Sequence, residues 1–223
     1  HLVYSDNFVG AFVRGVTLEQ AISKFKREIE LYSRWSGQDV ELADCNIAIV
    51  QRKLSTLQIC DADSDVIFDS ERLPLNNEQY ESLKELALKS AKDFLCLYNS
   101  IEGKDSTSLK PRKTFYGDVP ITAREMYEHT KNVNSYYFGE IGIDVSNEPD
   151  ILTCRAEGFE RLEQQKDFLE NKVHNGSYDE ECSLRKLLRR FIWHDRIHAK
   201  AMYKMASSLF NNAEIANPFY FDK

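Results

Sequence analysis

The residues most able to do chemistry are three of the five histidines, His129, His194 and His198. His194 and His198 are four residues apart, which on a helix places both rings on one face about 6 Å apart along the axis. This H-x-x-x-H spacing lets two imidazoles bind one metal ion. A third histidine from a neighbouring helix would complete the ligand count of a catalytic zinc site with one position open.

The pattern around His194 and His198 indicates which way they point. At about 100° per residue, the apolar residues of this predicted helix fall in one sector together with both histidines. The apolar residues are Leu184, Leu187, Leu188, Phe191, Met202, Met205 and Leu209. The basic residues fall in the opposite sector and predict a solvent face. They are Arg185, Lys186, Arg189, Arg190, Arg196, Lys200 and Lys204.

His129 shows the same inward pattern on an earlier predicted helix, in a sector that holds Thr122, Met126, Val133, Tyr136 and Tyr137. A single inward histidine is usually a hydrogen-bonded core residue, and that alternative stays open for each ring. Three buried imidazoles close together would each need a polar partner in an apolar layer, however. One divalent ion would satisfy all three.

Other polar residues near these histidines have simpler roles available. Glu125 could orient His129, but a T-x-x-E capping box with Thr122 explains it better. Asp195 could orient a ligand or pair with a basic residue of another helix. Tyr136 and Tyr137 could donate hydrogen bonds or pack as aromatics, and His174 is expected to cap a helix end rather than bind metal.

The run Leu187–His198, together with the earlier inward His129, resembles the DinB and YfiT-like superfamily of metal-binding four-helix bundles, over about residues 73–208. The resemblance implies that His129, His194 and His198 are the ligands of nickel or zinc. It also implies a thiol-dependent transferase or isomerase activity on a small molecule, with a low-molecular-weight thiol as cofactor, and a possible homodimer. Residues 10–21 resemble, more weakly, the small α/β fold of HicB-like proteins.

The chain is expected to be α+β, with a β-β-α-β unit over residues 1–72 and an antiparallel four-helix bundle with a C-terminal tail over residues 73–223. The unit has short strands before Arg14, a helix from Thr17 to about Trp35 and a strand over residues 45–57. The acidic run 60–65 is expected to be a solvated loop rather than a calcium site, because it lacks the EF-hand glycine and terminal glutamate.

The bundle helices are expected over about residues 77–101, from Thr122 onward, over 149–173 and over 183–210, with Pro149 at the first position of the third. No candidate ligand precedes residue 73, so a fragment that begins there should stay helical and keep its metal. Trp193 and Ile197 project among the bases of the last helix. They predict a contact with the aromatic tail 219–221, with a second chain or with the front unit, in that order of preference.

Composition excludes several classes of protein. The 223 residues are 42% hydrophobic and 29% charged, as in ordinary globular proteins, and the net charge of −7 disfavours a nucleic-acid partner. The longest stretch without a charged residue, 205–213, is far shorter than a membrane span. Five scattered cysteines without a CxxC pair indicate reduced thiols and a cytoplasmic location.

These features together favour a metal-dependent enzyme that acts on a small thiol or amide substrate, either as a transferase or isomerase or as a hydrolase. No residue is indicated as a general base. The alternative is a non-catalytic interaction protein in which the metal is structural or absent. An open coordination position would favour the enzyme, and a fourth protein ligand would favour the alternative.

Overall fold

The computed structural model describes residues 1–38, 40, 46–58, 66–114, 117–210 and 214–222. The protein is mixed α+β, with three two-stranded antiparallel sheets among these residues. In chain order the elements are β1 (Leu2–Tyr4), β2 (Phe12–Arg14), α1 (Leu18–Ser23), α2 (Phe25–Ser36), η2 (Asp69–Arg72), α3 (Asn77–Asn99), β3 (Lys113–Thr114), β4 (Gly117–Asp118), α4 (Ala123–Gly139), α5 (Ile151–Glu163), η3 (Phe168–Glu170), β5 (His174–Asn175), η4 (Ser177–Asp179), β6 (Glu181–Cys182) and α6 (Leu184–Leu209).

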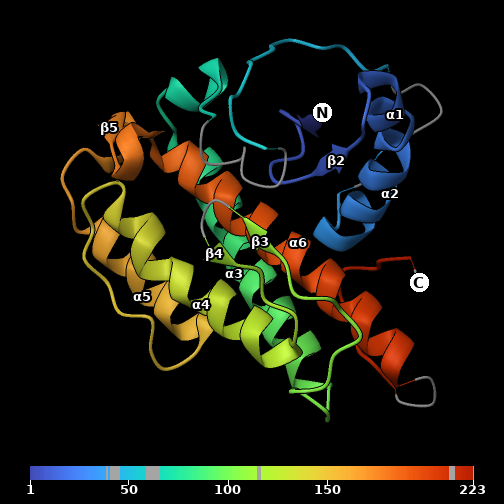
Figure 1. Ribbon diagram of the computed structural model, residues 1–223. Helices are drawn as coiled ribbons and strands as arrows, with labels where there is room; N and C mark the ends of the chain where they lie inside the picture. The colour runs from blue at the N-terminus through green and yellow to red at the C-terminus, as the bar shows by residue number, and fades with distance from the viewer. Residues whose placement is uncertain (39, 41–45, 59–65, 115–116, 211–213, 223) are drawn as a thin grey trace.

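The long helix α6 lies at the centre of the molecule (Figure 1). On one side it packs against α3 and α4, and each of these helices also packs against α5. On the other side it is covered by the front unit, which consists of residues 1–72 and contains the β1–β2 hairpin, α1, α2 and η2. The two halves contribute to one cluster of buried apolar residues, which includes Tyr32 and Trp35 of α2. The boundary at residue 72 and the independence of the four helices stay predictions.

The front unit differs from its prediction in two places. Thr17 accepts the hydrogen bond from the Gln20 backbone N–H as the expected N-cap, but the helix divides at Lys24 into α1 and α2. Residues 46–57 form no strand, and Val50 and Leu54 lie exposed. Alternating apolar residues give strand propensity, but a strand also needs a paired edge in register, and none of the described strands pairs with this segment. The β-β-α-β prediction is therefore wrong in its last strand over these residues.

Residues 41–45 and 59–65 lie outside the described part of the chain. The prediction of a solvated loop over residues 60–65 and the first residue of the predicted strand 45–57 fall there.

Local capping positions most of the long helices as the sequence indicates. Thr122 and Glu125 form the expected capping box of α4, and Ser183 accepts from the Lys186 backbone N–H at the start of α6. The third helix, α5, differs at both ends. Its N-cap is Asp150, whose carboxylate accepts from two backbone N–H groups, so Pro149 lies before the cap rather than at the first helical position.

The helix α5 ends at Glu163, about ten residues before the predicted end. The chain then turns through Asp167, whose φ of 61° is incompatible with a right-handed helix, into the short helix η3. Gly and Pro are absent at this turn, so the pattern of the sequence gave no stop signal before the Asn175-Gly176 pair.

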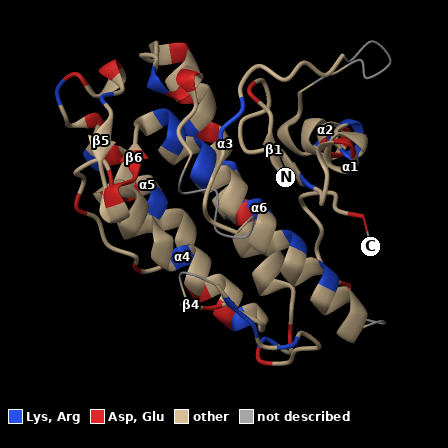
Figure 2. Cartoon of the chain, turned by 45° about the horizontal axis from the view of Figure 1, so that its top comes forward, with Lys and Arg blue, Asp and Glu red and all other residues tan. Residues whose placement is uncertain are grey.

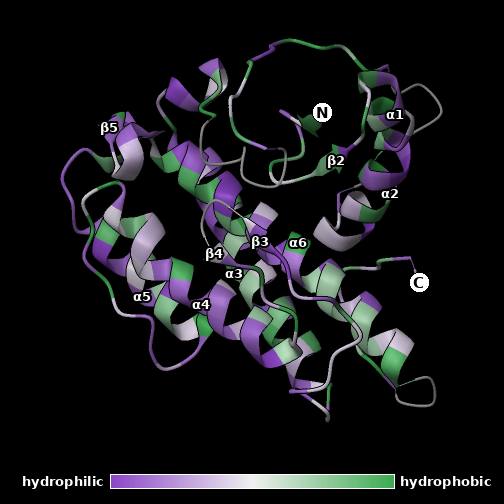
Figure 3. Cartoon of the chain, viewed as in Figure 1, coloured by the Kyte–Doolittle hydropathy of each residue, from purple (hydrophilic) through white to green (hydrophobic). Residues whose placement is uncertain are grey.

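The predicted solvent face of α6 is wrong in its N-terminal half, where Lys186, Arg189, Arg190 and Arg196 are buried. Figure 2 shows these basic positions along α6, and Figure 3 shows hydrophilic and hydrophobic positions alternating on the same helix. The front unit supplies acidic partners for Arg189 and Arg196, whereas Arg190 lies over the ring of Tyr137 of α4 and Lys186 donates to the Glu181 carbonyl. Buried charges are tolerated where such partners are present. The row of basic residues on this side of α6 therefore did not mark a solvent-exposed face.

Two ion pairs join the front unit to α6. Arg189 Nε lies 2.5 Å from Glu71 Oε1, and Arg196 Nη2 lies 2.8 Å from Glu28 Oε1. All four side chains are almost fully buried. The guanidinium of Arg196 also lies 5.0 Å from the ring centroids of Tyr32 and Trp35.

Trp193 is buried, and its ring contacts Tyr4 and Phe12 at centroid distances of 6.4 and 5.9 Å. Of the three contacts predicted for Trp193, the front unit is therefore the one observed. The preferred partner, the C-terminal tail, lies further along the same helix, where the guanidinium of Arg196 is 5.9 and 5.6 Å from the ring centroids of Phe219 and Phe221. Phe219 is buried and also stacks on Trp35 at 5.5 Å.

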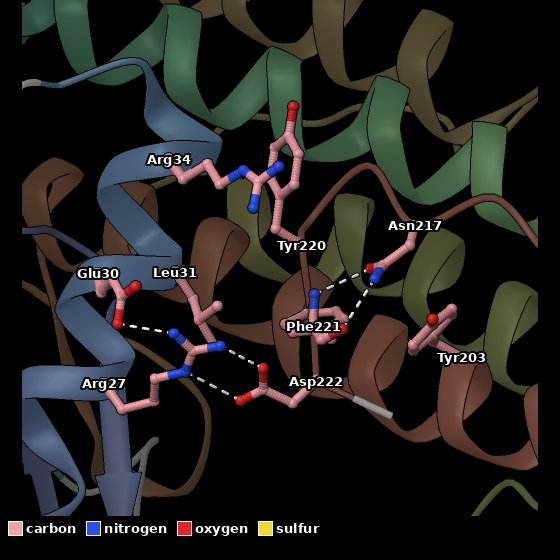
Figure 4. Close-up of a pocket in the computed structure, with 9 residues that line it drawn as sticks. All are labelled: Arg27, Glu30, Leu31, Arg34, Tyr203, Asn217, Tyr220, Phe221 and Asp222. Carbon is pink, nitrogen blue, oxygen red and sulfur yellow. Dashed lines mark hydrogen bonds and ion pairs between the residues drawn. The ribbon is translucent and has the colours of Figure 1, made fainter.

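The tail also forms one wall of a surface pocket of about 540 Å³ beside α2 (Figure 4). Arg27 of α2 donates to both carboxylate oxygens of Asp222, with a distance of 3.1 Å from Nε to Oδ2, and Arg34 lies over the ring of Tyr220 at 4.3 Å. Among the described residues, no helix is both long and apolar enough to cross a membrane.

Candidate metal centre

The packing of α4 against α6 brings the rings of His129, His194 and His198 together. The ring centroids are 5.0 Å apart for His129 and His194, 4.8 Å for His129 and His198, and 4.5 Å for His194 and His198. One potential ligand atom from each ring can be chosen so that all three lie within 4.8 Å of one another. We call this group the histidine cluster.

The nitrogen spacing of the histidine cluster suits a small divalent ion. Bonds of 2.0–2.1 Å in a tetrahedral site place two nitrogens about 3.3 Å apart, and His129 Nε2 lies 3.2 Å from His194 Nε2. All three ligand atoms lie within 4.8 Å of one another, so any longer separation must shorten for one ion to bind all three. The same 3.2 Å separation also suits a direct N–H···N hydrogen bond between neutral rings.

The histidine cluster is buried at one end and open at the other. His194 is 7% exposed, His198 is half-buried and His129 is exposed. The ring of His129 points toward the other two, as predicted, but the expected burial of all three is wrong for this residue. This residue lies at the edge of the α4–α6 contact, while Met126 and Thr130 on either side of it are buried. A molecule from solvent can approach the cluster at His129.

The surroundings of the three rings favour their neutral form. Burial is the main cause that lowers the pKa of each ring, to about 3 for His198 and well below the usual value for His194. For these two rings the neighbouring histidines act in the same direction. Only an unprotonated imidazole nitrogen can bind a metal ion, so the rings are in the state that binding requires.

One buried atom of the cluster lacks a partner. Nδ1 of His194 is shielded from solvent, and no described protein group hydrogen-bonds to it. A buried polar atom without a partner costs free energy. This atom is a different ring nitrogen from the Nε2 that faces His129, so it is an unmet hydrogen-bonding group that an ordered water can satisfy.

The carboxylates near the cluster have structural partners. Asp195 is fully buried and accepts hydrogen bonds from Arg155 of α5 and from Ser90 of α3. Of the two roles considered for it, pairing with a basic residue is the one observed. Glu125 accepts from the backbone N–H groups of Ile121 and Thr122, at 2.9 and 3.1 Å, and so serves as a cap.

Of the remaining candidates, Tyr137 lies next to the histidine cluster and His174 lies outside it. Tyr137 is buried, with its ring 5.9 Å from that of His194 and 5.2 Å from that of Phe191, which is aromatic packing next to the site. His174 lies in β5, exposed and outside the cluster. It caps no helix there, because α5 has already ended.

Within the described chain, no cysteine or carboxylate joins the three histidines. Sequence reasoning missed Arg14 and Arg112, whose positive charges act on His198. Neither residue lies on a metal-binding pattern, and Arg14 belongs to a strand of the front unit that only the tertiary fold brings near α6. A cavity of about 1000 Å³ lies elsewhere, between the β1–β2 hairpin and residues 46–57.

The fold and the site together define a class: an α+β protein with a cluster of three neutral histidines between two of its long helices. No family model, curated protein or solved structure matches this chain. The functional argument therefore rests on the residues themselves.

Proposed function

We propose that the protein is a metal-dependent enzyme in which His129, His194 and His198 bind one zinc or nickel ion and a small molecule binds at the open side. The observation that carries the proposal is the convergence of three histidines from two helices, with ligand atoms within 4.8 Å of one another. A three-histidine set with an open position is typical of catalytic zinc rather than of structural zinc, which usually has four protein ligands.

The histidines of this chain would hold the ion and expose it toward the side of His129. When bound, a divalent ion supplies Lewis-acid chemistry and lowers the pKa of a water or thiol. We therefore propose transfer or isomerisation that uses a low-molecular-weight thiol, or hydrolysis, as the reaction class. The resemblance to the DinB and YfiT-like superfamily favours the first of these.

The second candidate function is a non-catalytic interaction protein. The direct 3.2 Å contact between His129 and His194 favours it, because two neutral rings at this distance can satisfy each other without an ion. A cytoplasmic location and a homodimer, which the sequence led us to expect, belong to either proposal.

Elemental analysis tests the choice. Protein purified without affinity nickel and without added metal should contain close to one zinc or nickel ion per chain. Substitution of any one histidine of the cluster by alanine should lower the metal content and the melting temperature together, because binding to the folded state adds RT ln(1 + [L]/Kd) to its stability. His174→Ala is the matched control and should leave both unchanged.

If the wild-type protein contains no metal, or if all three alanine variants keep the wild-type content, the enzyme proposal is wrong.

A further inference from the structure

A cavity of about 1000 Å³ lies apart from the histidine cluster. It is lined by the β1–β2 hairpin, α1, α2, η2 and residues 46–57 (Figure 1). Most of its lining is apolar, and the apolar side chains include those of Tyr4, Val9, Ile22, Phe25, Ile49 and Phe68. Sites for small molecules usually occupy about 300–1,000 Å³ and have mainly apolar walls. The cavity therefore has the size and the lining of a binding site.

The wall of the cavity that the hairpin forms is fixed by two contacts. Tyr32 of α2 donates from its hydroxyl to the carbonyl oxygen of Val9 at 2.7 Å. Gly10 packs so closely on α6 that a Cβ at this position would lie 2.5 Å from Cγ2 of Ile192, and its φ of 90° is in the left-handed region that favours glycine. The hairpin is therefore held against α2 and α6 and cannot move to fill the cavity without breaking these contacts.

The wall that η2 forms is also fixed. Arg189 reaches it from α6, and its guanidinium carbon lies 4.5 Å from the ring centroid of Tyr4 and 5.1 Å from that of Phe68. The backbone N–H of Asp69 donates to the side-chain oxygen of Gln51 at 3.0 Å, which joins the segment around Gln51 to η2. The cavity is thus preformed, and a preformed site loses less free energy to ordering when a ligand binds.

One segment of the lining exposes apolar side chains at the mouth of the cavity. Ile49, Val50 and Leu54 line the cavity and are 42%, 80% and 98% exposed. The exposed Arg52 and Lys53 lie between the last two in sequence and line the cavity as well. Clustered exposed apolar side chains mark a binding surface. Because basic side chains accompany them here, the mouth suits a ligand that is both apolar and charged.

The charges that line the cavity indicate the sign of that charge. The basic side chains outnumber the acidic ones five to two, and they are Lys26, Arg52, Lys53, Arg185 and Arg189. Of the acidic ones, Glu71 is neutralised by Arg189 in their buried ion pair, and Asp6 accepts from the hydroxyl of Ser70 at 2.7 Å. A basic lining in a chain with a net charge of −7 is electrostatically complementary to a negatively charged group.

We propose that this cavity binds one fatty acid, with the hydrocarbon chain between the hairpin and residues 46–57 and the carboxylate at the mouth beside Arg52 and Lys53. Burial of the hydrocarbon chain supplies most of the affinity, and the two basic side chains select an anionic head group over a neutral one. The site is separate from the histidine cluster and does not depend on a bound metal ion.

Titration of the full-length chain with cis-parinaric acid, a naturally fluorescent fatty acid, tests the proposal. At concentrations at which the acid is monomeric, its emission should rise and saturate near one molecule per chain. Ile49→Asp places a charge on the cavity wall at an exposed position and should weaken binding at least tenfold. Arg52→Glu with Lys53→Glu reverses two charges at the mouth and should weaken binding about three- to tenfold.

Matched controls separate the cavity from general effects of charge. Leu109→Asp introduces the same charge at an exposed apolar position outside the cavity, and Lys166→Glu with Lys172→Glu reverses two exposed charges elsewhere. Both should bind parinarate as the wild type does. Parinaryl alcohol, which lacks the carboxylate, should bind to the Arg52→Glu, Lys53→Glu variant within about twofold of wild type. Removal of metal ions with a chelator should leave parinarate binding unchanged.

The proposal is wrong if the wild-type chain does not bind monomeric parinarate, or if Ile49→Asp and the charge-reversed variant both bind it as the wild type does. An equal loss of parinarate and of the alcohol in the charge-reversed variant would also overturn it, because the charge would not select the ligand.

Two further results would assign the cavity to another occupant and contradict the proposal. If the wild type sediments with anionic phospholipid vesicles but does not bind monomeric parinarate, the exposed segment contacts a membrane surface. If Ile49→Asp dissociates a wild-type dimer that does not bind parinarate, a second copy of the chain covers the cavity. Neither result affects the proposed metal site, which shares no residue with this cavity.

Discussion

The buried ion pair of Arg155 and Asp195 ties the three helices α3, α5 and α6 together directly behind His194. Both side chains are 0% exposed, Arg155 Nη2 lies 3.1 Å from Asp195 Oδ1, and Ser90 donates to the other carboxylate oxygen at 2.5 Å. The guanidinium of Arg155 also lies 4.1 Å from the ring centroid of Phe191. We expect Asp195→Ala to leave the guanidinium of Arg155 buried without a counter-charge.

The cost follows from the burial of both partners. Removing one member of a buried pair costs about 3–5 kcal/mol, because the remaining charge has lost its counter-charge without regaining water. With a denaturant slope of about 2–3 kcal/mol per molar urea, the unfolding midpoint should fall by about 1–2.5 M. The assay is equilibrium urea unfolding followed by circular dichroism.

An exposed pair of the same chemistry provides the control. Arg124 and Asp105 also form two hydrogen bonds, but their side chains are 53% and 71% exposed. Asp105→Ala should cost less than about 1 kcal/mol. The double variant Arg155→Met with Asp195→Leu removes both buried charges and should lie within about 2 kcal/mol of wild type.

The reasoning is refuted if Asp195→Ala costs no more than Asp105→Ala. It is also refuted if the double variant is destabilised as much as the single one, because the loss would then come from packing and not from an unpaired charge.

Three further predictions concern thiols, pH and the tail. In the folded protein a maleimide or iodoacetamide should label the exposed Cys96 much faster than Cys154, since burial raises the pKa of the latter thiol to about 11; peptide mass spectrometry checks this, and equal labelling would contradict it. Burial, aided by neighbouring arginines, lowers the pKa of Lys186 from 10.5 to about 8, so between these pH values the folded state binds fewer protons than the unfolded state. The unfolding free energy of the wild type relative to Lys186→Met should therefore rise from pH 8 to pH 10.5 in urea titrations. A flat or falling difference would refute the pKa shift. Deletion of residues 217–223 removes two buried phenylalanines, one of which stacks on Trp35, and should lower the unfolding free energy by several kcal/mol and redshift tryptophan fluorescence; an unchanged melting temperature would show that the tail does not pack there.

The parts of the fold that the sequence predicted are those with a strong local cause. The capping box of Thr122 and Glu125 and the N-cap of Ser183 fix where α4 and α6 begin, and both are hydrogen bonds within one turn. The inward sector of α6 is also correct, since Leu187 and Phe191 are fully buried. Local geometry decides such features, so a single sequence contains them.

The features that were missed depend on tertiary contacts. Arg196 looked solvent-exposed because its partner, Glu28, is distant in sequence. Residues 46–57 have the alternation of a strand, but strand formation depends on an available edge. His129 was expected to be buried, but its exposure depends on how α4 crosses α6. The periodicity of one helix does not predict how it crosses another.

The candidate site shows the same division. The four-residue spacing of His194 and His198 predicted a shared face of one helix, and their rings lie 4.5 Å apart. That His129 joins them depended on which helices pack together. The charge of Arg14, which helps to lower the pKa of His198, could not be found from spacing, because Arg14 comes from a hairpin whose place beside α6 is set by the contact of Trp193 with Tyr4 and Phe12.

The central claim is that three histidines share one metal ion and leave a position open. X-ray absorption at the metal edge, on protein purified without affinity nickel or added metal, tests it most directly. We predict three imidazole nitrogens at about 2.0–2.1 Å and at least one further light atom from solvent or a small ligand. His198→Ala should show one imidazole ligand fewer and should bind the metal ion more weakly. A spectrum with sulfur ligands from protein thiols, or one that His129→Ala, His194→Ala and His198→Ala all leave unchanged, would contradict the account.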